Sequence, residues 1–77
     1  MQFTPLQGQY LAFIHAYMKM YRRPPAERDL QRHFRVTPPT VHQMILKLEK
    51  NGLITRVPGQ ARSIGLCVSP ADLPPLE

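Results

Sequence analysis

The stretch Val36-Thr37-Pro38-Pro39-Thr40-Val41 decides the fold of this chain. Threonine caps helix N-termini, and prolines are tolerated in the first helical turn because the amides there have no intrahelical acceptor. After the cap, apolar residues recur at the spacing i, i+3, i+4 and i+7, which places them on one face of a helix: Val41, Met44, Ile45 and Leu48. Asn51-Gly52 suits a helix end, where a left-handed residue is common. We therefore predict a helix that starts after Thr37, stops near Gly52 and buries one face.

Two more helices are predicted upstream of this stretch. Thr4-Pro5-Leu6-Gln7 offers a cap, a first-turn proline and a glutamine that can complete a capping box. Apolar residues continue at helical spacing towards Arg22, and Pro24-Pro25 ends the helix because a residue before proline is pushed out of the α region. A shorter helix from about Glu27 to His33 follows, with acidic residues in its first turn, where the helix dipole favours them.

Downstream of Gly52 the apolar period changes from helical to alternating. We predict a strand from Leu53 to Val57, a turn at Pro58-Gly59-Gln60-Ala61, and a second strand from Ser63 to Val68 whose alternate apolar residues are buried. The order helix, short helix, turn, helix and β-hairpin is that of a winged helix-turn-helix. The predicted fold class is mainly α with a small β-hairpin, built from three helices and a two-stranded wing.

The net charge of +5 is unevenly distributed along the 77 residues. The last nine residues, 69–77, hold two acidic residues, three prolines and no basic residue. Residues 1–68 therefore hold ten Lys and Arg against three Asp and Glu, a formal charge of +7. We predict one folded domain over 1–68 and a flexible, extended or disordered tail over 69–77, because so proline-rich a segment suits neither a helix nor an inner strand. A basic domain favours an anionic partner, which is nucleic acid, an acidic protein or a membrane surface.

Several classes of protein find no support in the sequence. No apolar run approaches the ~18 residues that a membrane span needs, and the N-terminus lacks the pattern of a signal peptide. One cysteine excludes an internal disulfide and fits a reducing cytosol. The three histidines and Cys67 lack metal-ligand spacing, and neither a glycine-rich phosphate loop nor paired carboxylates occur. We therefore expect a cytoplasmic protein without metal, cofactor, small-molecule ligand, membrane contact or enzymatic activity.

Much of the chain resembles the DNA-binding domain of LexA repressors. The resemblance covers roughly residues 3–68 and lies in these segments: Thr4-Pro5-Leu6-Gln7, Pro24-Pro25, Leu30, Phe34, the capped third helix, Asn51-Gly52-Leu53-Ile54 and residues 58–64. It implies sequence-specific binding to double-stranded DNA by a transcriptional regulator, in this family a repressor, that is associated with the nucleoid when bound. Residues 36–54 alone are also similar to winged regulators of the GntR and MarR types.

Two departures from the LexA pattern limit what the resemblance implies. LexA repressors continue into a self-cleaving serine/lysine peptidase domain, whereas this sequence ends at Glu77, so we expect neither autocleavage nor the dimer contacts of that domain. Pro39 stands where the family often has an asparagine early in the recognition helix. Because proline has no side-chain amide and no backbone N–H, we expect a different target sequence.

The candidate DNA-binding residues follow from the way in which a recognition helix presents its outward face, N-terminal end first, to the major groove. With the apolar face inward, that set is the cap Thr37 together with Pro39, Thr40, His42, Gln43, Leu46, Lys47 and Lys50. Gln43 can read adenine with two hydrogen bonds, and Thr40 can meet a base edge or a thymine methyl group. The two lysines are expected to reach phosphates.

Basic residues outside this helix complete the candidate surface. Arg28, Arg32 and Arg35 lie on or just after the second helix, which crosses the DNA backbone in this motif, so we expect them to position the domain. The resemblance to LexA implies that the wing contacts the neighbouring groove or backbone, where Arg62 matches the arginine of the family and Gln60 lies at the tip. Counterion release then predicts a steep salt dependence.

The first helix carries more apolar surface than a one-sided core stripe needs. The excess positions are Leu6, Phe13, Tyr17, Met20 and Tyr21. They form a candidate surface for a homodimer or for another partner. The alternative is that the tail or the hairpin covers them.

Three functions stay open at the level of sequence. The leading one is double-stranded DNA binding by a regulator that occupies an operator, favoured by the +7 domain and by Arg62. The second is a winged-helix protein-interaction or assembly module that does not read DNA, favoured by Leu46 on the outward face, the two prolines at the helix start and the wide first-helix face. Binding to structured RNA is the third.

Overall fold

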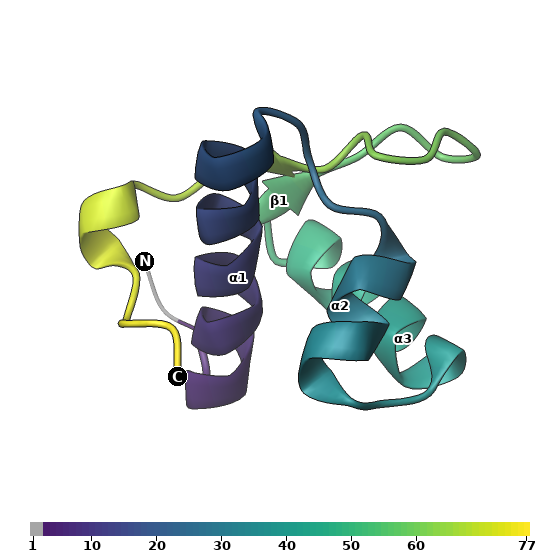
Figure 1. Ribbon diagram of the computed structural model, residues 1–77, viewed down its shortest axis with the longest axis horizontal. Helices are drawn as coiled ribbons and strands as arrows, with labels where there is room; N and C mark the ends of the chain where they lie inside the picture. Colours follow the sequence, from purple (N-terminus) through teal and green to yellow (C-terminus); the bar gives the residue numbers. More distant parts are fainter. Residues whose placement is uncertain (1–2) are drawn as a thin grey trace.

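Three helices and a two-stranded antiparallel hairpin make up the computed structural model, which describes residues 3–77 (Figure 1). The elements are α1 (Pro5–Tyr21), α2 (Glu27–Phe34), α3 (Pro38–Lys50), β1 (Ile54–Thr55), β2 (Gly65–Leu66) and a 3-10 helix, η1 (Pro70–Asp72). The helix α1 lies between the C-terminal tail on one side and the α2–α3 pair on the other, and the wing projects beyond α2 (Figure 1). The predicted winged helix-turn-helix is confirmed.

The helix α1 begins and ends where the sequence predicts. Thr4 Oγ1 accepts from the Gln7 amide at 3.1 Å, and Gln7 Oε1 accepts from the Thr4 amide at 2.9 Å, so the predicted capping box is present. The helix ends at Arg22, which adopts the left-handed conformation with φ 58° just before the two prolines.

Side chains also accept from backbone amides at the starts of α2 and α3. Asp29 Oδ2 accepts from the Ala26 amide at 2.8 Å at the start of α2. Thr37 Oγ1 accepts from the Thr40 amide at 3.4 Å at the start of α3. The predicted inward face of α3 is confirmed: Val41, Ile45 and Leu48 are buried and Met44 is half-buried.

A single core joins all of these elements. Its buried residues are Tyr10, Leu11, Ile14, Leu30, Val41, Ile45, Leu48, Leu53, Ile54, Ile64 and Val68. The ring of Tyr10 stacks on that of Phe34 with centroids 4.1 Å apart, which joins α1 to the end of α2. Each fully buried Leu or Ile side chain contributes about 1.5–3 kcal/mol, so this core fixes how α2 and α3 are placed against α1.

The wing differs from its prediction in the length of its strands. Each predicted strand of five or six residues is reduced to two, with Ile54 opposite Leu66 and Thr55 opposite Gly65. On the tip side of these pairs the Ser63 hydroxyl joins the two arms, because it accepts from the Val57 amide at 2.9 Å; on the other side the Cys67 amide donates to the Leu53 carbonyl at 3.0 Å. The prediction of alternate burial in the second arm holds for Ile64 and Val68, whereas Leu66 is only half-buried.

The predicted turn at the wing tip is present. The Gln60 amide donates to the Val57 carbonyl at 3.1 Å, which closes a four-residue turn. Gly59, the third residue of that turn, has φ 77°, a left-handed conformation that glycine adopts without steric cost. The Pro58-Gly59 pair therefore holds Gln60 at the outer end of the wing.

The C-terminal tail holds a short 3-10 helix and makes contacts with α1 that its prolines do not predict. Ser69 caps the 3-10 helix η1, and the rest of the tail runs along α1 on the side opposite α2 (Figure 1). Gln9 Nε2 donates to the Pro75 carbonyl at 2.9 Å, and the Glu77 amide donates to Gln9 Oε1 at 2.9 Å. The physical reason is that proline-rich backbone needs few hydrogen-bond partners and can lie on a helix through its side chains. The boundary between a domain of residues 1–68 and a flexible tail stays a prediction.

Candidate nucleic-acid interface

The outward face of α3 is solvent-exposed over its whole length. Each residue predicted on that face is exposed: Pro39, Thr40, His42, Gln43, Leu46, Lys47 and Lys50. Thr37, the cap, is exposed as well, and its hydroxyl lies 2.9 Å from that of Thr40. The structure therefore brings the predicted reading residues together on one surface, in the order in which a recognition helix meets a groove.

The middle of this face is free of internal contacts. Within residues 3–77, neither Gln43 nor Lys47 makes a side-chain hydrogen bond or an ion pair with the rest of the chain. Leu46 has 41% of its surface exposed, although it is apolar. A long amide, a long ammonium and an exposed aliphatic group therefore stand side by side, able to meet base edges, phosphates and methyl groups.

His42 differs from its neighbours because it contacts α2. Its Nδ1 lies 3.2 Å from Oε2 and 3.3 Å from Oε1 of Glu27, the first residue of α2. The sequence did not predict Glu27 as a partner of His42, since the two residues are 15 positions apart. The pair joins the starts of the two helices at the edge of the candidate interface.

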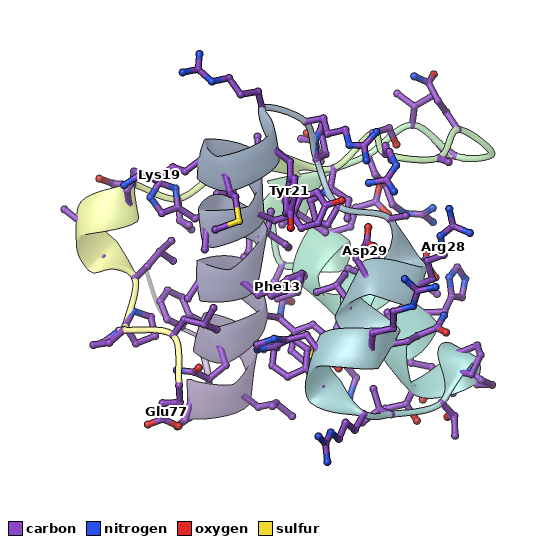
Figure 2. The ribbon with its side chains drawn as sticks, in the orientation of Figure 1. Phe13, Lys19, Tyr21, Arg28, Asp29 and Glu77 are labelled. Atoms are coloured by element: carbon purple, nitrogen blue, oxygen red, sulfur yellow. The ribbon has the colours of Figure 1, made fainter. Side chains whose placement is uncertain are left out.

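The arginines on α2 are exposed, as expected for residues that position a domain on phosphates. Arg28 and Arg32 lie on the helix, and Arg35 is its left-handed C-cap with φ 56°. Arg28 points away from α1 (Figure 2). A further arginine, Arg56, escaped the sequence reading; it is half-buried and donates to Glu49 at 3.0 Å, which makes it part of the wing base.

Arg62, which the resemblance to LexA assigns to DNA contact at the wing, makes hydrogen bonds to the helices in this structure. Its Nη1 donates to the Tyr17 hydroxyl at 2.9 Å, to Asp29 Oδ2 at 3.1 Å and to the Pro24 carbonyl at 3.3 Å. Only 25% of its side chain is exposed. The cause is a carboxylate and a tyrosine on the first two helices, which offer a guanidinium better partners than water does. Gln60, at the wing tip, is exposed as predicted.

The electrostatics around Asp29 strengthen this contact. Burial by itself raises the pKa of the Asp29 carboxyl. The hydrogen bond from the Ala26 amide, the charge of Arg62 and the hydrogen bonds from Tyr17 and Arg62 outweigh burial, so the pKa lies below its usual value. Asp29 is therefore ionised at neutral pH and forms a charged pair with Arg62 at the base of the wing.

The candidate partner surface on α1 is divided by the structure. Leu6, Met20 and Tyr21 are exposed by 53%, 74% and 54%. Phe13 and Tyr17 are half-buried: the ring of Phe13 packs on His33 with centroids 4.6 Å apart, and Tyr17 accepts from Arg62. Figure 2 shows Phe13 and Tyr21 on the side of α1 that faces α2. A groove of about 430 Å³ opens there, with Leu76 of the tail among its lining residues.

Comparison with known proteins identifies the family. Residues 1–63 match the family described as LexA DNA binding domain. The chain belongs to this family. The earlier resemblance to LexA is thereby confirmed.

Relatives in the LexA family cover most of the chain. The LexA repressor of Thermosipho africanus is 41% identical over 90% of this chain and 35% of its own length. The corresponding figures are 41%, 82% and 32% for the LexA repressor of Thermosipho melanesiensis, and 36%, 84% and 33% for that of Geobacter metallireducens. The chain thus spans about a third of the length of these LexA repressors.

Two further structural observations concern residues 3–77 of this LexA-family chain. In this part of the sequence, no helix combines the length and the apolar character that a membrane crossing requires. Nor do three or more His, Cys, Asp or Glu side chains of these residues gather where they could hold a metal ion.

Proposed function

We propose that this chain binds double-stranded DNA sequence-specifically, as the operator-binding domain of a transcriptional repressor. The observation that carries the proposal is the exposed face of α3, with Gln43 and Lys47 free of internal contacts, in a chain of the LexA DNA-binding-domain family. Its role is binding rather than catalysis. Such a repressor acts in the cytoplasm, on the nucleoid.

We assign the recognition of the DNA base sequence to the N-terminal half of α3. When this end enters the major groove, Gln43 can donate to and accept from adenine, and such a pair discriminates against a wrong base by about 1–3 kcal/mol. The hydroxyl of Thr40, already held by Thr37, is directed by that contact towards a base edge or a phosphate. Lys47 and Lys50 lie further along the same face and are assigned to phosphates.

The arginines of α2 supply the non-specific part of the affinity. Arg28, Arg32 and Arg35 are exposed on or just after α2, the helix that crosses the DNA backbone in this motif. Each phosphate that such a group neutralises releases counterions and steepens the salt dependence. Gln60, exposed at the wing tip, is assigned to the duplex beside the α3 site.

A second function is favoured by the apolar residues that stay exposed. Leu46 on α3, together with Met20 and Tyr21 on α1, would suit a module that docks protein. We assign Met20 and Tyr21, the two residues on α1, to the interface of a homodimer formed by the DNA-bound domain. Light scattering at tens of micromolar tests this assignment: a dimer supports it, and a monomer with and without operator DNA contradicts it.

The proposed function is tested by selecting sites from random duplex DNA and titrating the selected duplex at two salt concentrations. The expected result is an enriched motif whose affinity falls steeply with salt and exceeds that for random duplex by about a thousandfold or more. Absence of both enrichment and binding at low salt contradicts it and favours the protein-docking function. Binding without enrichment would show an architectural protein that does not read sequence.

A further inference from the structure

Among residues 3–77, Arg62 provides the hydrogen bonds that connect the wing loop, residues 57–63, to the helices. Within residues 3–77, the contacts of the loop 57–63 run either inside the loop, through Ser63 and Gln60, or from the Arg62 side chain to the helices. Its three acceptors lie on different parts of the fold: Tyr17 on α1, Pro24 in the loop after α1, and Asp29 on α2. Arg62 therefore ties the loop 57–63 to α1 and α2, while the Arg56–Glu49 pair joins the base of the wing to α3.

The backbone at Arg62 is held in an unfavourable conformation. Its φ is 56°, in the left-handed region that side-chain-bearing residues avoid. Such a conformation persists where the surroundings impose it. Here it turns the side chain of a wing residue back towards α1 and α2, so the local backbone and the three hydrogen bonds act together.

Asp29 links this contact to the helix-turn-helix itself. The same oxygen, Oδ2, accepts from Arg62 at 3.1 Å and from the Ala26 amide at 2.8 Å. The second of these bonds caps α2, and α2 packs on α3. The direction of the wing is thereby tied to the element that carries the recognition helix.

Between the wing tip and the helices the molecule is open. A groove of about 440 Å³ separates them, lined on the wing by Gln60 and Ala61 and on the helices by Glu27 and His42. Packing in this region therefore cannot set the distance from Gln60 to the outward face of α3. The side-chain contacts that hold the wing on either side of this groove are those of Arg62 with the first two helices and of Arg56 with Glu49.

We propose that Arg62, Asp29 and Tyr17 form a positioning unit that fixes the wing at one distance from α3, so that Gln60 meets DNA in register with Gln43. Arg62 acts on DNA through the wing and is not itself a phosphate contact. The inference rests on the proposed function, since it concerns the flank of the same DNA site. It assigns Asp29, an acidic residue, a favourable role in binding a polyanion.

Because Asp29 is acidic, the direction of the change in DNA affinity on replacing it tests the inference. If the unit positions the wing, replacing Asp29 by Asn releases Arg62 and weakens binding to the flank, although it removes a negative charge. If Arg62 instead contacts phosphate, the same replacement frees its guanidinium, and both the affinity and the salt slope increase. The two accounts therefore predict opposite changes for one substitution.

The experiment compares two duplexes that share the selected core, one ending at the α3 site and one extended beneath the wing. For the unaltered chain, we expect the extension to increase affinity about tenfold, as one or two direct contacts would. Arg62→Asn, Asp29→Asn and Tyr17→Phe should reduce that gain to about twofold or less, with the short duplex bound as before. The double variant Arg62→Asn/Asp29→Asn should lose no more than either single variant, because both break one unit.

Control variants separate this role from folding and from charge. Asparagine tolerates positive φ, so Arg62→Asn removes the guanidinium without adding backbone strain. Asp72→Asn removes a carboxylate from the tail and should leave the gain from the extension unchanged. Thermal melting reports whether each variant is folded. If Arg62→Asn is unfolded, Arg62→Lys replaces it in the comparison; because lysine keeps the charge, this variant should retain part of the affinity gained from the extension.

Three outcomes would overturn the inference. The first is tighter binding of the extended duplex by Asp29→Asn. The second is an unchanged gain from the extension in Arg62→Asn together with a salt slope lower by about one, which would make Arg62 a phosphate contact. The third is an unaltered chain that binds no duplex with sequence preference; that result contradicts the proposed function itself and is recognised before any variant is made.

Discussion

Gln9 and Glu77 face each other across 68 positions of the sequence, with the Glu77 amide donating to Gln9 Oε1 at 2.9 Å. The same side chain donates through Nε2 to the Pro75 carbonyl at 2.9 Å. One residue earlier, a Cβ on Gly8 would lie 2.9 Å from Phe3 and 3.0 Å from Pro74. The tail is therefore seated against a stretch of α1 that leaves no room for a larger residue.

Replacing Gln9 by Ala should release the end of the tail. Two hydrogen bonds are lost at a partly exposed site, so we expect the free energy of unfolding in urea to fall by about 1 kcal/mol. Hydrogen exchange at the Glu77 amide should become faster. Gln43→Ala, which shortens an exposed glutamine on α3, is the matched control and should change neither quantity. Equal exchange in both variants would contradict the seating of the tail.

Replacing Thr37 by Ala should destabilise α3 at its first turn. The Thr37 hydroxyl is the cap of that helix and also lies 2.9 Å from the hydroxyl of Thr40. We expect a loss of about 1 kcal/mol in the free energy of unfolding, as is usual for a cap, whereas Thr37→Ser should retain most of it. If Thr37→Ala unfolds at the same urea concentration as the unaltered chain, while Thr4→Ala does not, the cap on α3 is energetically unimportant.

The residues that sequence predicted well are those whose partners are close in the chain. Thr4 caps through Gln7, and Thr37 caps through Thr40, each three positions away. The outward and inward faces of α3 follow from a period that is read within four residues. These local features place the recognition helix and hence most of the candidate interface.

The features that the sequence did not predict depend on partners that are distant in the chain, or on a side chain that makes a hydrogen bond where the backbone was expected to make one. Arg62 turns inward to donate to Asp29 and Tyr17, which lie 33 and 45 positions away in the sequence. The tail packs on α1 through contacts that span 66 and 68 positions. Towards the tip of the wing, a contact of the Ser63 hydroxyl with the Val57 amide stands in place of backbone pairing. Neither periodicity nor capping rules report such contacts.

The pairing of Asp29 should give stability a specific pH dependence. The pKa of Asp29 is lower in the folded chain than its ordinary value of 3.8, so the folded state favours the carboxylate more than the unfolded state does. The resulting stabilisation is complete above that ordinary value and is lost as the pH falls through the folded-state pKa. The difference in unfolding free energy between the unaltered chain and Asp29→Asn should therefore be constant near neutral pH and shrink in acid.

Urea unfolding at a series of pH values measures this difference. Asp72→Asn removes a tail carboxylate that makes no ion pair within residues 3–77 and controls for the loss of one charge. A difference for Asp29→Asn that grows as the pH falls would have the wrong sign and would contradict the charged pair with Arg62.

Replacing Lys47 by Ala should weaken binding to all DNA sequences alike. A lysine on a phosphate contributes through counterion release, so the slope of log affinity against log salt should become shallower by about one. Affinity titrations of the selected duplex and of a random duplex, each at several salt concentrations, measure both quantities. Lys19→Ala, on the side of α1 away from α2, removes the same charge and should leave the slope nearly unchanged (Figure 2). A loss confined to the selected duplex would make Lys47 a base contact instead.

We propose that the outward face of α3 reads DNA through Gln43. The most direct measurement is site selection from random duplex DNA with the unaltered chain and with Gln43→Ala, analysed base pair by base pair. The account predicts that the variant loses its preference at one or two adjacent positions, by about 1–3 kcal/mol each, and keeps the rest of the motif. An identical motif from both proteins, or an equal loss of preference at every position, would contradict it.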